Sequence, residues 1–214
     1  MIGGVELEKN GPLDMHDFFR NNFPQYDNDE LINWLVSHSR VITIKKGDII
    51  FHPETDRSFS LYLLDGIIKT YIISPNGIEY TFAFYYEPGS CICMTKDMIN
   101  TPGIYCKALT PVKYIKLVGP SPYDLATKYP ELYPNLLRVF EPFYFGLLDK
   151  LRAFSTLTAK DRYLWFLNKY PDLVDKVSLA EVANFLGITP QSLSRIRTEL
   201  AEEQGVTPPR KINN

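Results

Sequence analysis

The chain has 214 residues, enough for one sizeable domain and a smaller second one. Its 45% hydrophobic and 22% charged residues are typical of a globular protein, and its net charge of −2 argues against purely electrostatic binding of nucleic acid. No apolar run reaches the roughly 18–20 residues that cross a bilayer, the first residues lack a secretion signal, and three cysteines do not make a disulfide framework. We therefore expect a cytoplasmic protein without membrane contact.

The first predicted element is a helix that Asp27 caps, with Glu30 reaching back to the cap. From Val41 to Leu117, short apolar and aromatic runs alternate with turn residues, as antiparallel strands do. The predicted strands are 41–44, 49–51, 61–64, 67–73, 80–86, 104–108 and 112–117. Asn76-Gly77 between two of them is a strong hairpin signal. The region predicts an antiparallel sandwich or barrel, and the absence of βαβ alternation argues against a doubly wound sheet.

A helix beyond Pro134 has apolar residues at alternating intervals of three and four. They are Leu137, Phe140, Tyr144, Leu147, Leu151 and Phe154. This heptad spacing is typical of a seam between paired helices, although a helix packed on its own barrel has the same pattern. We interpret the seam as a dimer interface. Pro142 lies within it and predicts a kink or the effective start of the helix.

Three helical segments follow this seam. Thr158 caps the first, which ends at Tyr170-Pro171. Ser178 opens a capping box for a helix over 179–186. Thr189 caps a third helix, which begins at Pro190, where the missing N–H of proline costs nothing.

The last two segments have the spacing of a helix-turn-helix. Helices that cross steeply need a small residue at the crossing, here Ala183, and the turn needs a residue that tolerates positive φ, here Gly187. The side chains expected to be buried between them are Val182, Leu186, Ile188, Leu193 and Ile196. The candidate DNA-binding residues on the exposed face are Thr189, Gln191, Ser192, Ser194, Arg195 and Arg197. Gln reads adenine and Arg reads guanine through paired hydrogen bonds, while Thr and Ser suit phosphates. A three-helix bundle without DNA binding is the alternative.

The segment Leu186–Arg197, which reads LGITPQSLSRIR, resembles the recognition element of the CRP/FNR superfamily of bacterial transcription regulators. The segment Arg162–Pro171 resembles the one that precedes it there, and the turns at Gly47, Gly77 and Gly89 resemble those of the family's cyclic-nucleotide-binding-type barrel. The resemblance covers 18–197. It implies an α+β fold with an antiparallel jelly-roll barrel as effector domain (1–130), a dimerisation helix (131–156) and a helix-turn-helix domain (157–214) with a reduced or absent wing.

The resemblance also implies a mechanism. The barrel of such a regulator senses a signal, and the paired helices set the spacing of two recognition helices, so that two-fold DNA sites follow. This chain would then be a homodimer that regulates transcription on a two-fold operator of double-stranded DNA, with RNA polymerase as a further partner. Gln191 and Arg195 fall where the family reads bases, and Ser194 lies between them.

The effector domain departs from the family pattern. A cAMP-binding member has a Gly-Glu pair and then an arginine with Ser or Thr, but here Ser90 follows Gly89 and no arginine occurs between Arg57 and Arg138. Lysine lacks the planar fork that grips a phosphate. We expect an effector other than a cyclic nucleotide, or constitutive activity. The candidate effector pocket is the barrel interior, approached by Tyr86, Cys91, Cys93, Thr95, Lys96, Tyr105 and Lys107.

The cysteines leave thiol sensing open. Three thiolates without a histidine at ligand spacing do not close a zinc site, and Cys91 and Cys93, two apart on a strand, can both be core residues. We expect no metal and no cofactor. A cupin-type enzyme needs two or three histidines on adjacent strands, only His52 lies in the barrel, and no other catalytic motif occurs. A regulator rather than an enzyme is expected, with a ligand-binding signalling module that does not bind DNA as the alternative.

Overall fold

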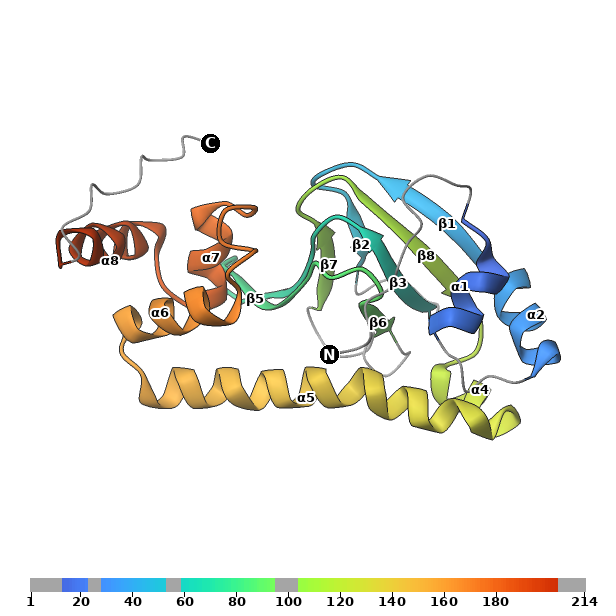
Figure 1. Cartoon of the computed structure of the whole chain (residues 1–214). Helices are drawn as coiled ribbons and strands as arrows, with labels where there is room; N and C mark the ends of the chain where they lie inside the picture. The colour runs from blue at the N-terminus through green and yellow to red at the C-terminus, as the bar shows by residue number, and fades with distance from the viewer. Residues whose placement is uncertain (1–12, 23–27, 53–58, 95–103, 204–214) are drawn as a thin grey trace. The chain divides into compact units, whose positions relative to one another are not determined.

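The computed structural model describes residues 13–22, 28–52, 59–94 and 104–203. The chain divides into two compact units, one of Met1–Thr70 with Phe84–Tyr144 and the other of Tyr71–Ala83 with Phe145–Asn214. Figure 1 labels the elements along the chain. Each unit is described by itself.

Eight described strands form two four-stranded sheets, in the orders β1-β8-β3-β6 and β2-β7-β4-β5. Their bounds are β1 (Ser39–Ile44), β2 (Ile49–Phe51), β3 (Phe59–Asp65), β4 (Ile68–Ile73), β5 (Glu79–Tyr85), β6 (Cys91–Met94), β7 (Tyr105–Ala108) and β8 (Val112–Val118). The registered pairs are antiparallel. The predicted antiparallel architecture is confirmed, but the sheets form an open sandwich rather than a closed barrel.

Alternation along β3 sends its side chains into two different cores. Phe59, Leu61 and Leu63 face the second sheet, while Tyr62 and Leu64 face the helices. The core between the sheets consists of Phe51, Phe59, Leu61, Leu63, Ile68, Ile92, Cys106, Ala108, Val112 and Tyr114. These side chains fill the interior in which the effector pocket is predicted.

Short helices cover the outer face of the first sheet. They are α1 (Met15–Asn22), α2 (Asp29–Ser37), α4 (Pro122–Lys128) and the 3-10 turn η1 (Pro130–Leu132). The side chain of Asn28 caps α2 by accepting from Leu31 N at 3.1 Å. The cap is therefore Asn28 and not the predicted Asp27, which lies outside the described residues, and the Glu30 carboxylate accepts from Lys128 and Tyr129 of α4 and its end. Phe18 and Phe19 meet the ring of Tyr62 edge-on, which anchors α1 to the sheet.

The turn between β4 and β5 is the predicted hairpin. Gly77 has a φ of +78°, which favours glycine at this position, and Ser74 N donates to Ile78 O at 2.9 Å to close the loop. The Asn76-Gly77 prediction is confirmed.

The long helix α5 (Tyr133–Thr156) follows η1 and carries the predicted heptad seam. It begins well before Pro142, so the expectation that this proline marks the effective start is wrong. Proline at an interior position removes one backbone N–H from the helix. None of the described helices is both long enough and apolar enough to span a membrane.

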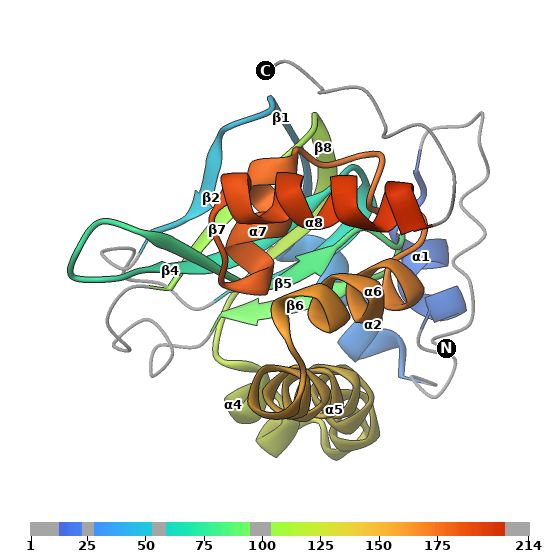
Figure 2. The same cartoon turned by 90° about the vertical axis from the view of Figure 1, so that its left-hand side faces the viewer.

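Three further helices, α6 (Ala159–Lys169), α7 (Leu179–Leu186) and α8 (Pro190–Glu203), form the core of the second unit (Figure 2). Thr158 caps α6 by accepting from Asp161 N, and Ser178 caps α7 by accepting from Glu181 N. The ring of Phe185 packs against those of Trp165, Phe166 and Tyr170. The three predicted helices and their caps are confirmed, because the signals that define them are local in sequence.

Candidate nucleic-acid interface and ligand cavity

Helices α7 and α8 form the predicted helix-turn-helix. Val182, Ala183 and Leu186 of α7 are fully buried, so the small side chain of Ala183 allows the close approach of α8. Gly187 adopts the left-handed conformation with a φ of +65°, and Ile188 N donates to Ala183 O at 3.1 Å to close the turn. Leu193 and Ile196 bury the inner face of α8.

The first turn of α8 is held by two hydroxyls. Thr189 Oγ1 accepts from Ser192 N at 3.1 Å and donates to Ser192 Oγ at 2.9 Å. In the second bond the Ser192 hydroxyl is the acceptor, so its own hydrogen is not used there. Pro190 has no N–H, and the N–H groups of Ser192 and Leu193 donate to Thr189, so the first-turn donors suited to a phosphate are the Ser192 hydroxyl and the Gln191 N–H.

The remaining candidate DNA-binding residues differ in exposure. Gln191 and Arg195 lie one turn apart on the exposed side of α8. The Arg195 side chain is 77% exposed, and its Nε lies 3.6 Å from Glu199 Oε1. Ser194 is half-buried. Arg197 is also half-buried and hydrogen-bonds Tyr163. Burial raises the pKa of the Tyr163 phenol, and the charge of Arg197 opposes this rise.

Lys150 of α5 is a half-buried amine that no sequence pattern singled out. Its Nζ donates to Thr81 O of the β4–β5 hairpin at 2.6 Å and lies 3.9 Å from the centre of the Phe185 ring. Burial lowers the pKa of Lys150 to about 7. Within the second unit, this amine therefore links the hairpin and α5 to the helix that precedes the turn.

Asp149, the neighbour of Lys150, fastens α6 to α5. Its carboxylate accepts from Lys169 Nζ at 2.5 Å, Arg152 at 2.9 Å and Trp165 Nε1 at 3.2 Å. The hydrogen bond from Lys169 is the main reason that the pKa of Asp149 falls to about 2.

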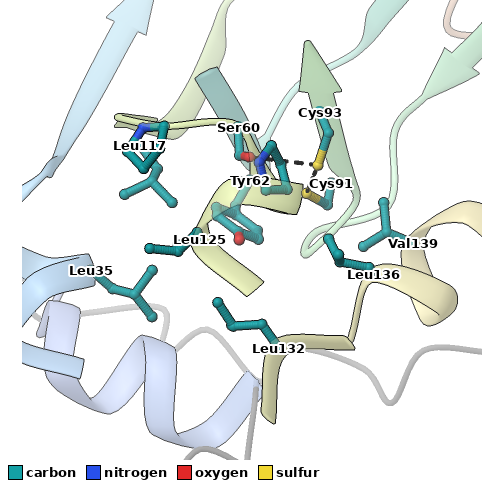
Figure 3. Close-up of a pocket in the computed structure, with 12 residues that line it drawn as sticks. Leu35, Ser60, Tyr62, Cys91, Cys93, Leu117, Leu125, Leu132, Leu136 and Val139 are labelled. Atoms are coloured by element: carbon teal, nitrogen blue, oxygen red, sulfur yellow. Dashed lines mark hydrogen bonds between the residues drawn. The ribbon is translucent and has the colours of Figure 1, made fainter. Parts of the chain in front are cut away.

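A cavity lies on the helix-covered face of the first sheet (Figure 3). Its volume is about 40 Å³, and its walls come from α2, β3, β6, β8, α4, η1 and α5. Cys91 and Cys93 line it, whereas Tyr86, Tyr105 and Lys107 are not among its described lining residues. Thr95 and Lys96 lie outside the described residues. The structure therefore brings together two members of the predicted effector set, outside the sheet sandwich.

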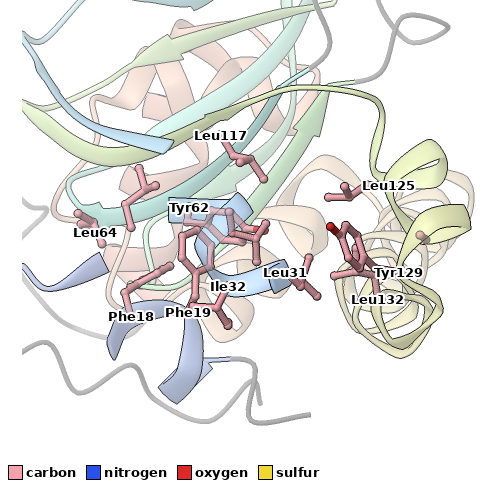
Figure 4. Close-up of a cluster of buried hydrophobic side chains, with 13 residues drawn as sticks. Phe18, Phe19, Leu31, Ile32, Tyr62, Leu64, Leu117, Leu125, Tyr129 and Leu132 are labelled. Carbon is pink, nitrogen blue, oxygen red and sulfur yellow. The ribbon is translucent and has the colours of Figure 1, made fainter. Parts of the chain in front are cut away.

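The cavity is a gap in an otherwise packed layer. Tyr62, Leu117, Leu125 and Leu132 belong both to its wall and to the cluster of buried side chains between sheet and helices (Figure 4). Sequence reasoning missed Ser60, Tyr62 and the leucines as lining residues. These side chains come from separate elements, so no local pattern connects them.

The two cysteines of the cavity interact directly. Their Sγ atoms lie 3.6 Å apart, and Ser60 Oγ donates to Cys93 Sγ at 3.5 Å. The hydrogen bond between the thiols raises the pKa of Cys91 and lowers that of Cys93. Cys106 lies in the core between the sheets, where burial raises its pKa. Within the described ranges, no three His, Cys, Asp or Glu residues gather in a way that could hold a metal ion.

The fold, an antiparallel sandwich followed by a long helix and a helix-turn-helix, is that of the CRP/FNR-type regulators. No protein-family model matches the chain, and no curated protein matches it. A CooA variant from Carboxydothermus hydrogenoformans is 16% identical with a TM-score of 0.66, and the match covers 95% of this chain and 89% of CooA. The c-di-GMP-responsive regulator CLP from Xanthomonas campestris is 13% identical with a TM-score of 0.67 (83% and 93% covered). A CRP/FNR-family transcriptional regulator from Thermus thermophilus is 19% identical with a TM-score of 0.58 (77% and 87% covered). The expected resemblance is confirmed at the level of the fold.

Proposed function

We propose that this protein is a sequence-specific DNA-binding transcription regulator that acts as a homodimer on two-fold sites in double-stranded DNA. The observation that carries the proposal is the α7–α8 pair, in which a buried Ala183, a left-handed Gly187 and a capped α8 present Gln191 and Arg195 to solvent. The transcriptional regulators with this fold support the same conclusion.

In this proposal, α8 lies in the major groove. Gln191 and Arg195 project from adjacent turns, so that they can read neighbouring bases as bidentate donors and acceptors. The ion pair between Arg195 and Glu199 is exposed and therefore weak, so guanine can replace the carboxylate. Thr189 and Ser192 bind backbone phosphates and fix the position of the helix. Ser194 and Arg197 support this contact, and Arg197 also ties α8 to α6 through Tyr163.

The proposed dimer surface is the apolar face of α5. Leu137 is 61% exposed, Tyr144 55% and Leu151 62%, and Phe140 and Leu147 are exposed in the same seam. Phe154, at the end of the seam, is half-buried. Phe143, Phe145 and Leu148 widen the exposed apolar face beyond the predicted heptad positions. A second copy of the chain with the same heptad spacing matches this surface, and pairing of α5 supplies the two-fold symmetry of the DNA site.

The control of the regulator is part of the proposal. Without the Gly-Glu pair after Gly89 and without a nearby arginine, we infer an effector other than a cyclic nucleotide, or constitutive activity. RNA polymerase is the further partner that a transcription regulator of this kind requires.

Selection of bound duplexes from a random double-stranded DNA library tests the DNA proposal. The purified protein should enrich a two-fold motif, and Arg195→Ala should lower affinity for the enriched duplex at least about fivefold because a bidentate base contact is worth about 1–3 kcal/mol. Arg40→Ala, which removes the same charge from an exposed position on β1, should leave the affinity within about twofold. If no motif is enriched, the protein is a signalling module without DNA binding. Unchanged affinity of Arg195→Ala would refute the assignment of α8.

The dimer proposal has its own test. Leu147→Asp places a charge in the seam and should give monomers in sedimentation velocity, since an unpaired charge buried in an apolar interface is strongly disfavoured. Leu164→Asp makes the same substitution at an exposed leucine of α6 and should leave the dimer intact. A dimer that persists in Leu147→Asp would show that the interface lies elsewhere.

A further inference from the structure

The cavity beneath α4 and the start of α5 contains a chain of four polar groups. Tyr62 and Ser60 lie opposite Cys91 and Cys93 in the β3–β6 ladder. The Tyr62 hydroxyl hydrogen-bonds Cys91, the Cys91 and Cys93 sulfurs lie 3.6 Å apart, and Ser60 donates to Cys93. Figure 3 shows both thiols in the cavity wall, opposite the leucines of the helices.

The rest of the wall is apolar. It consists of Leu35, Leu117, Pro120, Pro122, Leu125, Leu132, Leu136 and Val139. No charged side chain is among the described residues that line the cavity. A volume of about 40 Å³ can hold a few water-sized groups, since a cavity needs about 10–15 Å³ to hold one water molecule. It is well below the cavity of about 150 Å³ that holds benzene in another protein. The occupant that best fits the described wall is therefore a small group with affinity for sulfur.

A disulfide between Cys91 and Cys93 would lie at the limit of disulfide geometry. The Cα atoms of residues two apart on a strand are separated by about 6.6 Å, near the upper end of the roughly 4.4–6.8 Å that a disulfide spans. Consider a soft atom bonded to both sulfurs, with each bond about 2.3 Å long. A tetrahedral angle between the two bonds places the sulfurs about 3.8 Å apart, and the narrower angle of a pyramidal atom brings them closer. The observed 3.6 Å therefore suits a bridging atom.

The chemistry of the wall selects among soft atoms. Zinc and iron–sulfur clusters require four protein ligands or an open site with three, and the described residues offer two thiols here. Copper(I) held by two thiolates leaves a net negative charge, and no cation is among the described lining residues to compensate it. Trivalent arsenic bound by two sulfurs and one hydroxyl is neutral, and Ser60 and Tyr62 lie beside the sulfurs to hydrogen-bond that hydroxyl.

We propose that Cys91 and Cys93 form a dithiol site for trivalent arsenic, taken up as arsenous acid. Each thiol forms one As–S bond and displaces one of the three hydroxyls, which leaves as water with the thiol proton. Arsenic remains trivalent, and no electron acceptor is required. The lowered pKa of Cys93 makes its sulfur the first nucleophile. Cys106, in the other core, takes no part.

Sodium arsenite added to the reduced full-length protein tests the site. Elemental analysis after desalting should find one arsenic per chain. Cys91→Ser and Cys93→Ser should each bind arsenite at least a hundredfold more weakly, because a single thiol loses the effective concentration of the second. Cys106→Ala should bind as the wild type does. Circular dichroism of each variant verifies its fold. A small dithiol competitor should remove the arsenic from the wild type, and an equal concentration of a monothiol should not.

Three results would overturn the proposal. The first is arsenic bound equally by the wild type and both serine variants. The second is binding of zinc or copper(I) to the two thiols at lower concentrations than arsenite requires, which would identify a metal site. The third is a Cys91–Cys93 disulfide, formed by mild hydrogen peroxide while the secondary structure is retained, in a protein that does not bind arsenite. None of these readouts depends on DNA binding, so the site and the proposed function can fail separately.

Discussion

Replacement of Gly187 by alanine tests the turn on which the helix-turn-helix depends. An L-residue at a φ of +65° costs about 1–2 kcal/mol relative to glycine. The new Cβ would also lie 3.1 Å from Cε1 of Phe154, closer than an ordinary contact. The Phe154 ring lies 4.8 Å from the Arg162 guanidinium and 5.3 Å from Lys150 Nζ, so it cannot withdraw without weakening both contacts. We expect the free energy of unfolding of the second unit to fall by about 2–3 kcal/mol.

The matched control is Gly146→Ala in α5. An added Cβ at Gly146 meets nothing within 4 Å, so alanine should stabilise the helix by about 0.5–1 kcal/mol. Urea unfolding at one fixed protein concentration, followed by fluorescence, measures both variants. A Trp34→Phe background leaves Trp165 as the reporter, and its ring stacks on Phe185 within the second unit. Wild-type stability of Gly187→Ala would refute the argument, because it would mean that the turn does not require a left-handed residue.

Two further predictions concern the same unit. The pKa of Lys150 falls from 10.5 to about 7 on folding, so the unfolded chain takes up a proton that the folded chain does not as the pH falls from 10.5 to 7. The free energy of unfolding should therefore decrease as the pH falls through that window and level off below it. Lys150→Met should flatten the dependence of the urea midpoint on pH. An unchanged slope in this variant would contradict the burial of the amine. Ser178→Ala removes the cap of α7 and should lower the free energy of unfolding by about 1 kcal/mol in the same assay. Ser178→Asp can still cap the helix and should retain most of the stability. An equal loss of stability in both variants would argue against the cap.

The helix-turn-helix could be predicted nearly residue by residue because each of its determinants acts locally. Ser178, Gly187 and Thr189 fix the helix ends through bonds to backbone only a few residues away. The hairpin at Gly77 was equally predictable, since the turn itself requires a positive φ.

The cavity and the burial of Lys150 could not be predicted, because both depend on residues far apart in the sequence. Strand β6 has four residues and was not among the predicted strands, since its identity comes from pairing with β3 about thirty residues earlier. The side to which Cys91 and Cys93 point follows from that pairing. Lys150 occupies an ordinary helical position, and only the approach of the hairpin carbonyls shows that its amine is buried.

The charges around α8 favour the proposal that two copies act together on DNA. Arg195 forms an ion pair with Glu199, and Lys160 forms one with Glu203 at 2.5 Å. Arg197 hydrogen-bonds Tyr163. Neutralisation of phosphates supplies most nonspecific affinity, so we expect a single copy with this surface to bind weakly. The proposed pairing through α5 would make the second contact intramolecular and would multiply the two weak affinities. Discrimination between sites then depends on base contacts and on the spacing of the two recognition helices rather than on charge. Because Leu136 and Val139 line the cavity, an occupant of the cavity would contact α5, the helix through which we propose that two copies pair.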